Sequence, residues 1–126
     1  MVRLGALLTA ALVLAGCAAE GQTLGVSADG ARVQLDHRSS VEIVLEGNAT
    51  TGFSWELVAY DPAVIAPEGE PVYEEAETGM VGGGGAWVWT LVAQDPGECT
   101  VEFVYHRTWE DDPPERTFSF TAVVGG

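Results

Sequence analysis

Few of the residue types that carry out catalysis occur in this sequence, and none of them forms a recognised catalytic arrangement. His37 and His106 are the only histidines, and we interpret both as surface or strand residues. No serine lies in the G-x-S-x-G setting of a nucleophile elbow. Cys99 has no histidine partner with a defined role, so we expect it to be a small buried apolar residue. We therefore predict that the protein is not an enzyme.

The glycine-rich and acidic segments do not indicate a ligand site either. The run Gly82–Gly85 is not followed by Lys and Ser or Thr, and no helix is expected there, which excludes a phosphate-binding P-loop. The acidic residues at 74–77 and 111–112 lack the pattern that fixes several oxygens on one cation. We interpret them as a solvated acidic surface, and we expect neither a metal nor a cofactor.

The first sixteen residues have the features of an export signal. Arg3 gives a short positive region, and the apolar stretch from Leu4 to Leu14 is too short to span a bilayer. It ends in Leu-Ala-Gly-Cys17, which resembles the lipobox of bacterial lipoproteins. That resemblance implies a lipid on Cys17, secretion across the cytoplasmic membrane and anchoring at the bacterial cell envelope. An ordinary secretory signal followed by an unrelated cysteine is the alternative.

Charge and length limit the remaining possibilities. The chain has 19 acidic and 5 basic residues, for a formal net charge of −14, so phosphate backbones would repel it and nucleic acid is excluded as a partner. Removal of residues 1–16 leaves enough chain for one domain only. Residues 17–28 are small and polar without periodicity, and we expect a lipid-anchored linker there. Residues 29–126 then form the domain, with a monomer as the default state.

Alternating apolar residues predict that this domain is built from β-strands. The alternation is clearest over residues 41–45, 86–93 and 101–105, and a final strand is expected over residues 117–123. Weaker strand signals occur at 33–35, at 55–59 and, as an edge segment, at 72–73. No window after the signal has a convincing helical period. Several short strands separated by turn signals predict an all-β sandwich.

A segment between two of these strands, residues 47–55, has the composition of a binding loop. Glycines near both ends permit sharp turns, and Thr50 and Thr51 offer small hydroxyls and exposed peptide groups. Such a loop can enter a narrow cleft, with Phe53 and Trp55 anchoring its base. A plain hairpin connection is the simpler interpretation.

Two further segments have a similar character. The glycine run that ends at Gly85 can bring its backbone close to a partner, although a mobile loop tip would have the same composition. Residues 105–114 contain Arg107 and Trp109 in a stretch too polar to bury the indole fully. Trp and Arg are frequent binding hot spots. The simpler alternative is that Trp109 folds back over the end of the sandwich.

In this order the three segments resemble the motifs of chagasin-type (family I42) inhibitors of papain-like cysteine proteases. The family motif N-P-T-T-G-[FY]-x-W is matched by Asn48–Trp55, with Ala49 in place of proline. The glycine-rich motif before an aromatic strand is matched by Gly82–Gly85, and [YH]-x-R-P-W-E by Tyr105–Glu110, with Thr108 in place of proline. The prolines would stiffen their loops, so their replacement affects the tightness of binding more than the identity of the family.

The resemblance implies an immunoglobulin-like β-sandwich with three binding loops at one end, and reversible, non-covalent inhibition by occlusion of the active-site cleft. Thr50 and Thr51 would occupy the protease centre, while the glycine loop and Arg107 with Trp109 would contact the two cleft walls. The implied protease-binding residues are Asn48, Thr50, Thr51, Gly52, Phe53, Gly82, Gly83, Gly84, Gly85, Arg107 and Trp109. The alternative is an envelope lipoprotein whose Ig-like module binds another protein partner.

Overall fold

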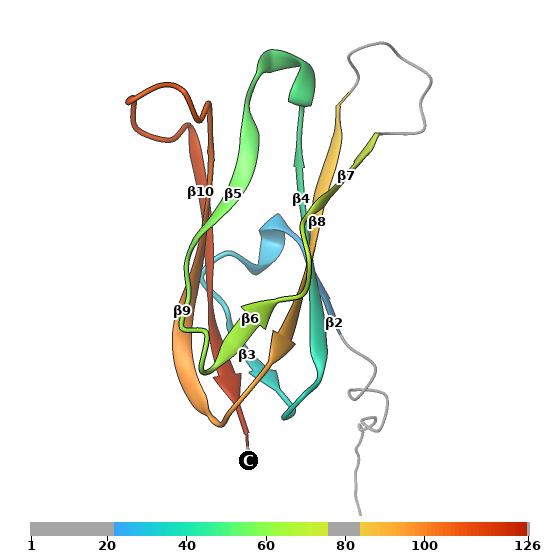
Figure 1. Cartoon of the computed structure of the whole chain (residues 1–126), viewed down its shortest axis with the longest axis vertical. Coiled ribbons are helices and arrows are strands. Elements are labelled where there is room, and N and C mark those ends of the chain that lie inside the picture. Colours follow the sequence, from blue (N-terminus) through green and yellow to red (C-terminus); the bar gives the residue numbers. More distant parts are fainter. Residues whose placement is uncertain (1–21, 76–83, 126) are drawn as a thin grey trace, which may run out of the picture.

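The segments with alternating apolar residues form two β-sheets that face each other (Figure 1). The computed structural model describes residues 22–75 and 84–125. Within these ranges the only helical segments are two short 3-10 turns, η3 (Val26–Ala28) and η4 (Ala49–Thr51), and no helix is long and apolar enough to cross a membrane. The predicted all-β, immunoglobulin-like sandwich is confirmed.

The first sheet has four strands. Their order across the sheet is β3 (Arg32–Leu35), β10 (Arg116–Val124), β9 (Gly97–His106) and β5 (Ser54–Ala59). β3 runs parallel to β10, and the other neighbours are antiparallel. Where β9 begins, the Arg32 guanidinium donates hydrogen bonds of 2.8 and 3.1 Å to Glu98, and this pairing lowers the pKa of the Glu98 carboxyl.

The second sheet has five strands. β2 (Gln22–Leu24), β4 (Ser40–Gly47), β8 (Gly85–Ala93) and β6 (Ile65–Pro67) follow one another, and β7 (Val72–Glu75) also pairs with β8. β6 and β7 pair with successive parts of β8, while β4 pairs with it along most of its length. The predicted edge segment at 72–73 therefore belongs to β7.

The core lies between the two sheets and is filled by the alternate residues that the sequence pattern selects. In β4, Val41, Ile43 and Leu45 are buried, while Glu42 and Glu46 on the opposite face are exposed, as a period of two requires. Aromatic rings from both sheets meet in the centre, where the ring of Trp89 on β8 lies 4.8 Å from that of Phe103 on β9. The largest fully buried side chains are Phe103, Phe118, Phe120, Ile43, Leu45, Ile65, Leu91, Val41 and Val101.

Three local features differ from the sequence-based expectation. Residues 22–28, which were expected to be linker, contain β2 and η3, and Leu24 packs against the core. β2 pairs with β4 through its backbone, so the sequence shows no apolar periodicity that would predict it. In β5 only Trp55 is buried; Leu57 packs against the core but stays partly exposed, and the register with β9 shifts between Leu57 and Ala59. Cys99 is half-buried rather than buried, although it packs against the core.

Truncation of a central core ring tests this packing. We expect Phe103→Ala to lower the free energy of unfolding by about 3–5 kcal/mol, because the removed ring is fully buried and leaves a cavity. Urea unfolding followed by tryptophan fluorescence measures the change. Val58→Ala, at an exposed position of β5, is the control and is expected to change it by less than about 0.5 kcal/mol. A loss below 1 kcal/mol for Phe103→Ala would contradict the described core.

Candidate functional site

The segments singled out in the sequence gather at one end of the sandwich, opposite the C-terminus (Figure 1). Loop 1 (residues 48–53) joins β4 to β5, and loop 3 (residues 107–115) joins β9 to β10. The end of β7 and the start of β8 lie at the same end, so Gly84 and Gly85 are brought beside loop 1. Gly82 and Gly83 lie outside the described residues, as does Cys17.

Loop 1 is held in shape by its own polar groups. Asn48 caps the turn η4: its side-chain oxygen accepts hydrogen bonds from the backbone N–H and the hydroxyl of Thr50, at 3.0 and 2.6 Å. The hydroxyl of Thr51 donates to the backbone carbonyl of Asn48 at 2.7 Å. Both threonines are exposed at the tip. The predicted small hydroxyls therefore also fix the conformation of the loop that presents them.

Gly52 ends the turn and forms the contact between loops 1 and 3. Its backbone has φ 85° and ψ −7°, the left-handed region that favours glycine. A Cβ at this position would lie 2.8 Å from Cη2 of Trp109, so the indole of loop 3 rests directly on the glycine. The indole nevertheless keeps 70% of its surface exposed. One side of the Trp109 indole therefore contacts Gly52, and most of the side chain stays exposed to solvent. The polar residues around it in the sequence predicted that it would not be fully buried.

Arg107 fastens loop 3 to loop 1. Its Nε donates a hydrogen bond of 3.1 Å to the backbone carbonyl of Thr51, and its guanidinium carbon lies 4.4 Å from the centre of the Phe53 ring. Glu110 accepts a further bond of 3.4 Å from the same guanidinium. Thr51, Phe53 and Arg107, which are predicted to contact a protease, therefore contact one another in the unbound protein.

The loops stand on an aromatic cluster formed by Phe53, Trp55, Tyr73, Trp87 and Tyr105. Tyr105 lies at its centre, with its ring 5.2 Å from Phe53, 5.1 Å from Trp55 and 6.1 Å from Trp87. Its hydroxyl accepts the backbone N–H of Asn48 at 2.9 Å. The rings of Tyr73 and Trp87 are tilted relative to each other, with their centres 4.5 Å apart. The cluster therefore joins strands of both sheets directly beneath the loops.

Gly47 makes this arrangement possible. A Cβ there would lie 2.7 Å from the Tyr105 ring and 2.8 Å from the Trp87 ring, so any side chain would displace the cluster. Gly47 is paired with Gly85 across β4 and β8, and Gly84 lies against the Gly47 carbonyl. The described part of the glycine run is thus fixed to the base of loop 1.

A second arginine and the Trp55 indole close the base of the site. The indole N–H of Trp55 donates to the carbonyl of Glu46 at 3.0 Å, and Arg116 donates to the same carbonyl at 3.3 Å. The Arg116 guanidinium lies over the Trp55 and Tyr105 rings at 5.2 and 5.4 Å. These contacts satisfy a backbone carbonyl next to loop 1 and restrain the aromatic rings.

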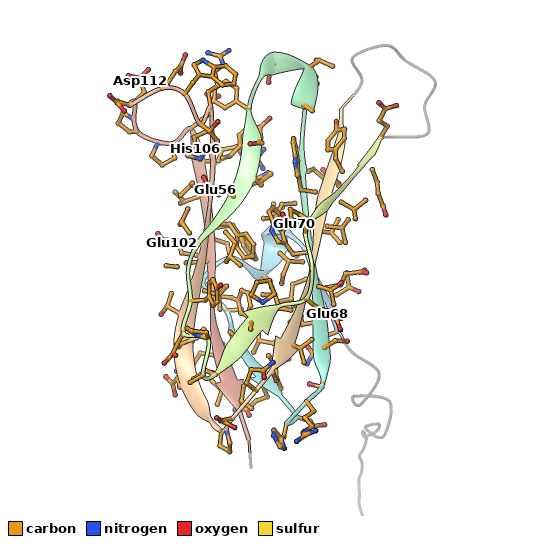
Figure 2. The ribbon with its side chains drawn as sticks, in the orientation of Figure 1. Glu56, Glu68, Glu70, Glu102, His106 and Asp112 are labelled. Carbon is orange, nitrogen blue, oxygen red and sulfur yellow. The ribbon has the colours of Figure 1, made fainter. Side chains whose placement is uncertain are left out.

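The flank of loop 3 is polar and acidic. His106 lies 2.7 Å from Glu56 on the neighbouring strand β5, and Figure 2 shows this pair below the loop that carries Asp112. A pocket of about 290 Å³ is lined there by residues that include Phe53, His106, Arg107, Glu110 and Asp112. Within residues 22–75 and 84–125, no three His, Cys, Asp or Glu side chains gather to hold a metal ion.

The structure brings together nine of the predicted protease-binding residues at one end; the other two, Gly82 and Gly83, are not described. From the sequence, Gly47 was predicted only to permit a turn, Tyr105 only to belong to a motif, and Tyr73 and Arg116 had no predicted role in the site. Tyr105 could have been found from its place in the buried alternation of β9. Tyr73 and Arg116 carry no local signal, because their contacts depend on how the sheets are assembled.

Comparison with known proteins identifies the family. Residues 34–124 match the model of the chagasin family of peptidase inhibitors, I42. Amoebiasin-1 of Entamoeba histolytica is 32% identical over 83 residues, which cover 66% of this chain and 79% of that protein.

Solved structures share the fold. The cysteine protease inhibitor EhICP2 from Entamoeba histolytica aligns with a TM-score of 0.73 and 19% identity, over 84% of this chain and 96% of its own. PbICP-C, solved in complex with falcipain-2, aligns with a TM-score of 0.62 and 19% identity, over 84% of this chain and 99% of its own.

Substitution of Gly52 separates backbone strain from the contact with Trp109. Gly52→Ala is expected to destabilise the protein by about 1–2 kcal/mol because of its positive φ, and to displace the Trp109 indole as well. Gly69→Ala is the matched control, since Gly69 has φ 75° but no atom near the added Cβ. Unfolding curves and the indole N–H signal of Trp109 in NMR spectra measure the two effects. An unchanged indole signal in Gly52→Ala would contradict the contact.

Proposed function

The chain belongs to the chagasin family of peptidase inhibitors, and on that premise we propose that it inhibits papain-like cysteine proteases reversibly by placing its three loops in the active-site cleft. The observation that carries this mechanism is the rigid construction of loop 1. Its turn is closed by Asn48, Thr50 and Thr51, and its base is bonded to Tyr105. A loop that is ordered before binding avoids part of the entropy cost of association.

Each loop has a part in the proposed complex. Loop 1 enters the cleft, with exposed Thr50 and Thr51 over the catalytic cysteine of the protease. The glycine run, Gly82–Gly85, faces one wall of the cleft. Arg107 and Trp109 face the other, and the 70% exposure of the indole leaves a large apolar surface available to the protease. Interfaces of this kind bury on the order of 800 Å² on each partner.

Inhibition in this proposal needs no covalent step. The hydroxyls of Thr50 and Thr51 are engaged in hydrogen bonds within the loop, and the single described cysteine, Cys99, lies near the start of β9, far from the loop end. Occlusion of the cleft is therefore sufficient. The complex of PbICP-C with falcipain-2 supports a cysteine protease as the partner.

The role of Trp109 can be measured with papain and a fluorogenic peptide substrate. We expect Trp109→Ala to raise the inhibition constant at least about thirtyfold, as for a binding hot spot. Because the indole is mostly exposed, the free energy of unfolding should change by less than about 0.5 kcal/mol. Val58→Ala, also at an exposed apolar position, is expected to inhibit like the wild type.

The same titration tests the proposal as a whole. A triple variant, Thr50→Ala/Thr51→Ala/Trp109→Ala, should lose inhibition by orders of magnitude while it remains folded. If the wild type inhibits neither papain nor a panel of its relatives at micromolar concentration, the proposed mechanism is wrong. The module would then bind a different protein partner through the same loops.

We also propose that the protein is a lipoprotein held at the bacterial cell envelope by a lipid on Cys17. The parallel register pairs Gln22 with Val41, near the start of β4, while loop 1 follows the end of β4. β2 therefore begins at the end of the sandwich opposite the loops. The five residue-to-residue steps from Cys17 to Gln22 span at most about 18 Å. Such an anchor would hold the domain near the membrane with its loops directed outward.

Incorporation of a labelled fatty acid in a bacterial host tests the anchor. The wild-type chain is expected to carry the label and Cys17→Ser to lack it, because the lipid is attached to that thiol. Cys99→Ser is the matched control and should be labelled like the wild type. Label that persists in Cys17→Ser, or a wild-type chain without label, would overturn the proposed anchor.

A further inference from the structure

Two tyrosine hydroxyls accept the two consecutive backbone N–H groups that lead into loop 1. Tyr105, on β9 of the four-stranded sheet, accepts the N–H of Asn48 at 2.9 Å. Tyr73, on β7 of the five-stranded sheet, accepts the N–H of Ala49 at 3.4 Å. Loop 1 passes from one sheet to the other, and its first turn is therefore bonded to a ring from each of them.

The position of Tyr73 is determined by β8. Tyr73 is paired with Trp87 across β7 and β8, and the two rings lie 4.5 Å apart. A Cβ on Gly85 would lie 2.9 Å from the Tyr73 hydroxyl, so the absence of a side chain there leaves the space in which the ring extends toward loop 1. The half-buried ring thus carries a hydroxyl that reaches across the second sheet to Ala49.

Resting on the proposed function, we propose that Tyr73 is a positioning residue that orders the inhibitory loop by holding the N–H of Ala49. A proline at position 49 would have no N–H to offer and would restrict the backbone by its own ring. Alanine keeps the N–H and does not restrict the backbone as a proline ring would. In this protein the hydrogen bond from that N–H to the Tyr73 hydroxyl supplies the restraint. Tyr73 also couples the start of loop 1 to the strand that leads into the glycine run.

The backbone at this place accommodates a proline, which makes the inference testable. Asn48 is extended, with φ −135° and ψ 105°, close to the conformation that a residue before proline adopts. Ala49 is the first residue of η4, where proline is well tolerated because the N–H there has no partner within the turn. Ala49→Pro therefore removes the N–H that donates to the Tyr73 hydroxyl, and it stiffens the loop without changing the path of the backbone.

The experiment is a double-substitution cycle with Tyr73→Phe and Ala49→Pro, read as inhibition constants against papain. Tyr73→Phe keeps the ring and removes only the hydroxyl, and we expect it to weaken inhibition by about threefold to tenfold. In the Ala49→Pro background the same substitution should change inhibition by less than about twofold. Tyr60→Phe removes a hydroxyl from an exposed tyrosine elsewhere and is expected to have no effect.

Equal weakening by Tyr73→Phe in both backgrounds would overturn the inference, because the hydroxyl would then act through a different contact. An unchanged inhibition constant in the Ala49 background would overturn it as well. A merely structural role of Tyr73 would lower the unfolding temperature without this dependence on residue 49. Recovery of wild-type inhibition in the double variant supports the positioning role.

An NMR measurement on the free protein separates this inference from the proposed function. In a ¹⁵N-labelled sample, Tyr73→Phe is expected to speed hydrogen exchange of the Ala49 amide at least about threefold and to leave the Asn48 amide within about twofold of the wild type. This result does not depend on any protease. Unchanged exchange at Ala49 would overturn the positioning role, while failure of the wild type to inhibit would overturn only the proposed function.

Discussion

The aromatic cluster beneath the loops is the contact on which the binding end depends. Tyr105 touches Phe53, Trp55 and Trp87 and also accepts the first N–H of loop 1. Each loop begins or ends within a few residues of one of these rings. Stacked and tilted rings add attraction beyond the area that they bury. The rings therefore fix the loop bases relative to one another, and the sheets carry that arrangement as a rigid support.

Glycine at position 47 is the counterpart of these large rings. Gly47 is paired with Gly85 across β4 and β8. Because Gly47 has no side chain, the rings of Tyr105 and Trp87 can both pack against its backbone. Large and small residues thus alternate at the rim of the core as they do inside it. The constraint is steric, and it operates before any protein partner is bound.

Loop 1 contains neither cysteine nor proline, and other contacts hold its conformation. Asn48, Thr50 and Thr51 close the turn by hydrogen bonds, and Arg107 crosses from loop 3 to bind its carbonyl and cover the Phe53 ring. Charge-assisted bonds to backbone groups are stronger than neutral ones, which suits a restraint at an exposed tip. In a chain with a net charge of −14, Arg107 and Arg116 both lie over aromatic rings at this end. Their aromatic and backbone contacts make them part of the support for the loops.

Local composition and the period of two of a β-strand were enough to predict the strands with clear alternation and the residues that face the core. They also predicted that Trp109 would not be fully buried, but left open whether it folds back over the end of the sandwich. The sequence also located loops 1 and 3. β2 and β6, of three residues each, are too short to show a period and exist through their backbone pairing. Only the tertiary structure placed Tyr73 on Ala49, 24 positions earlier, and Arg107 on Thr51, 56 positions earlier. Contacts over such separations depend on strand register and on how the two sheets face each other, which no local pattern of residues records.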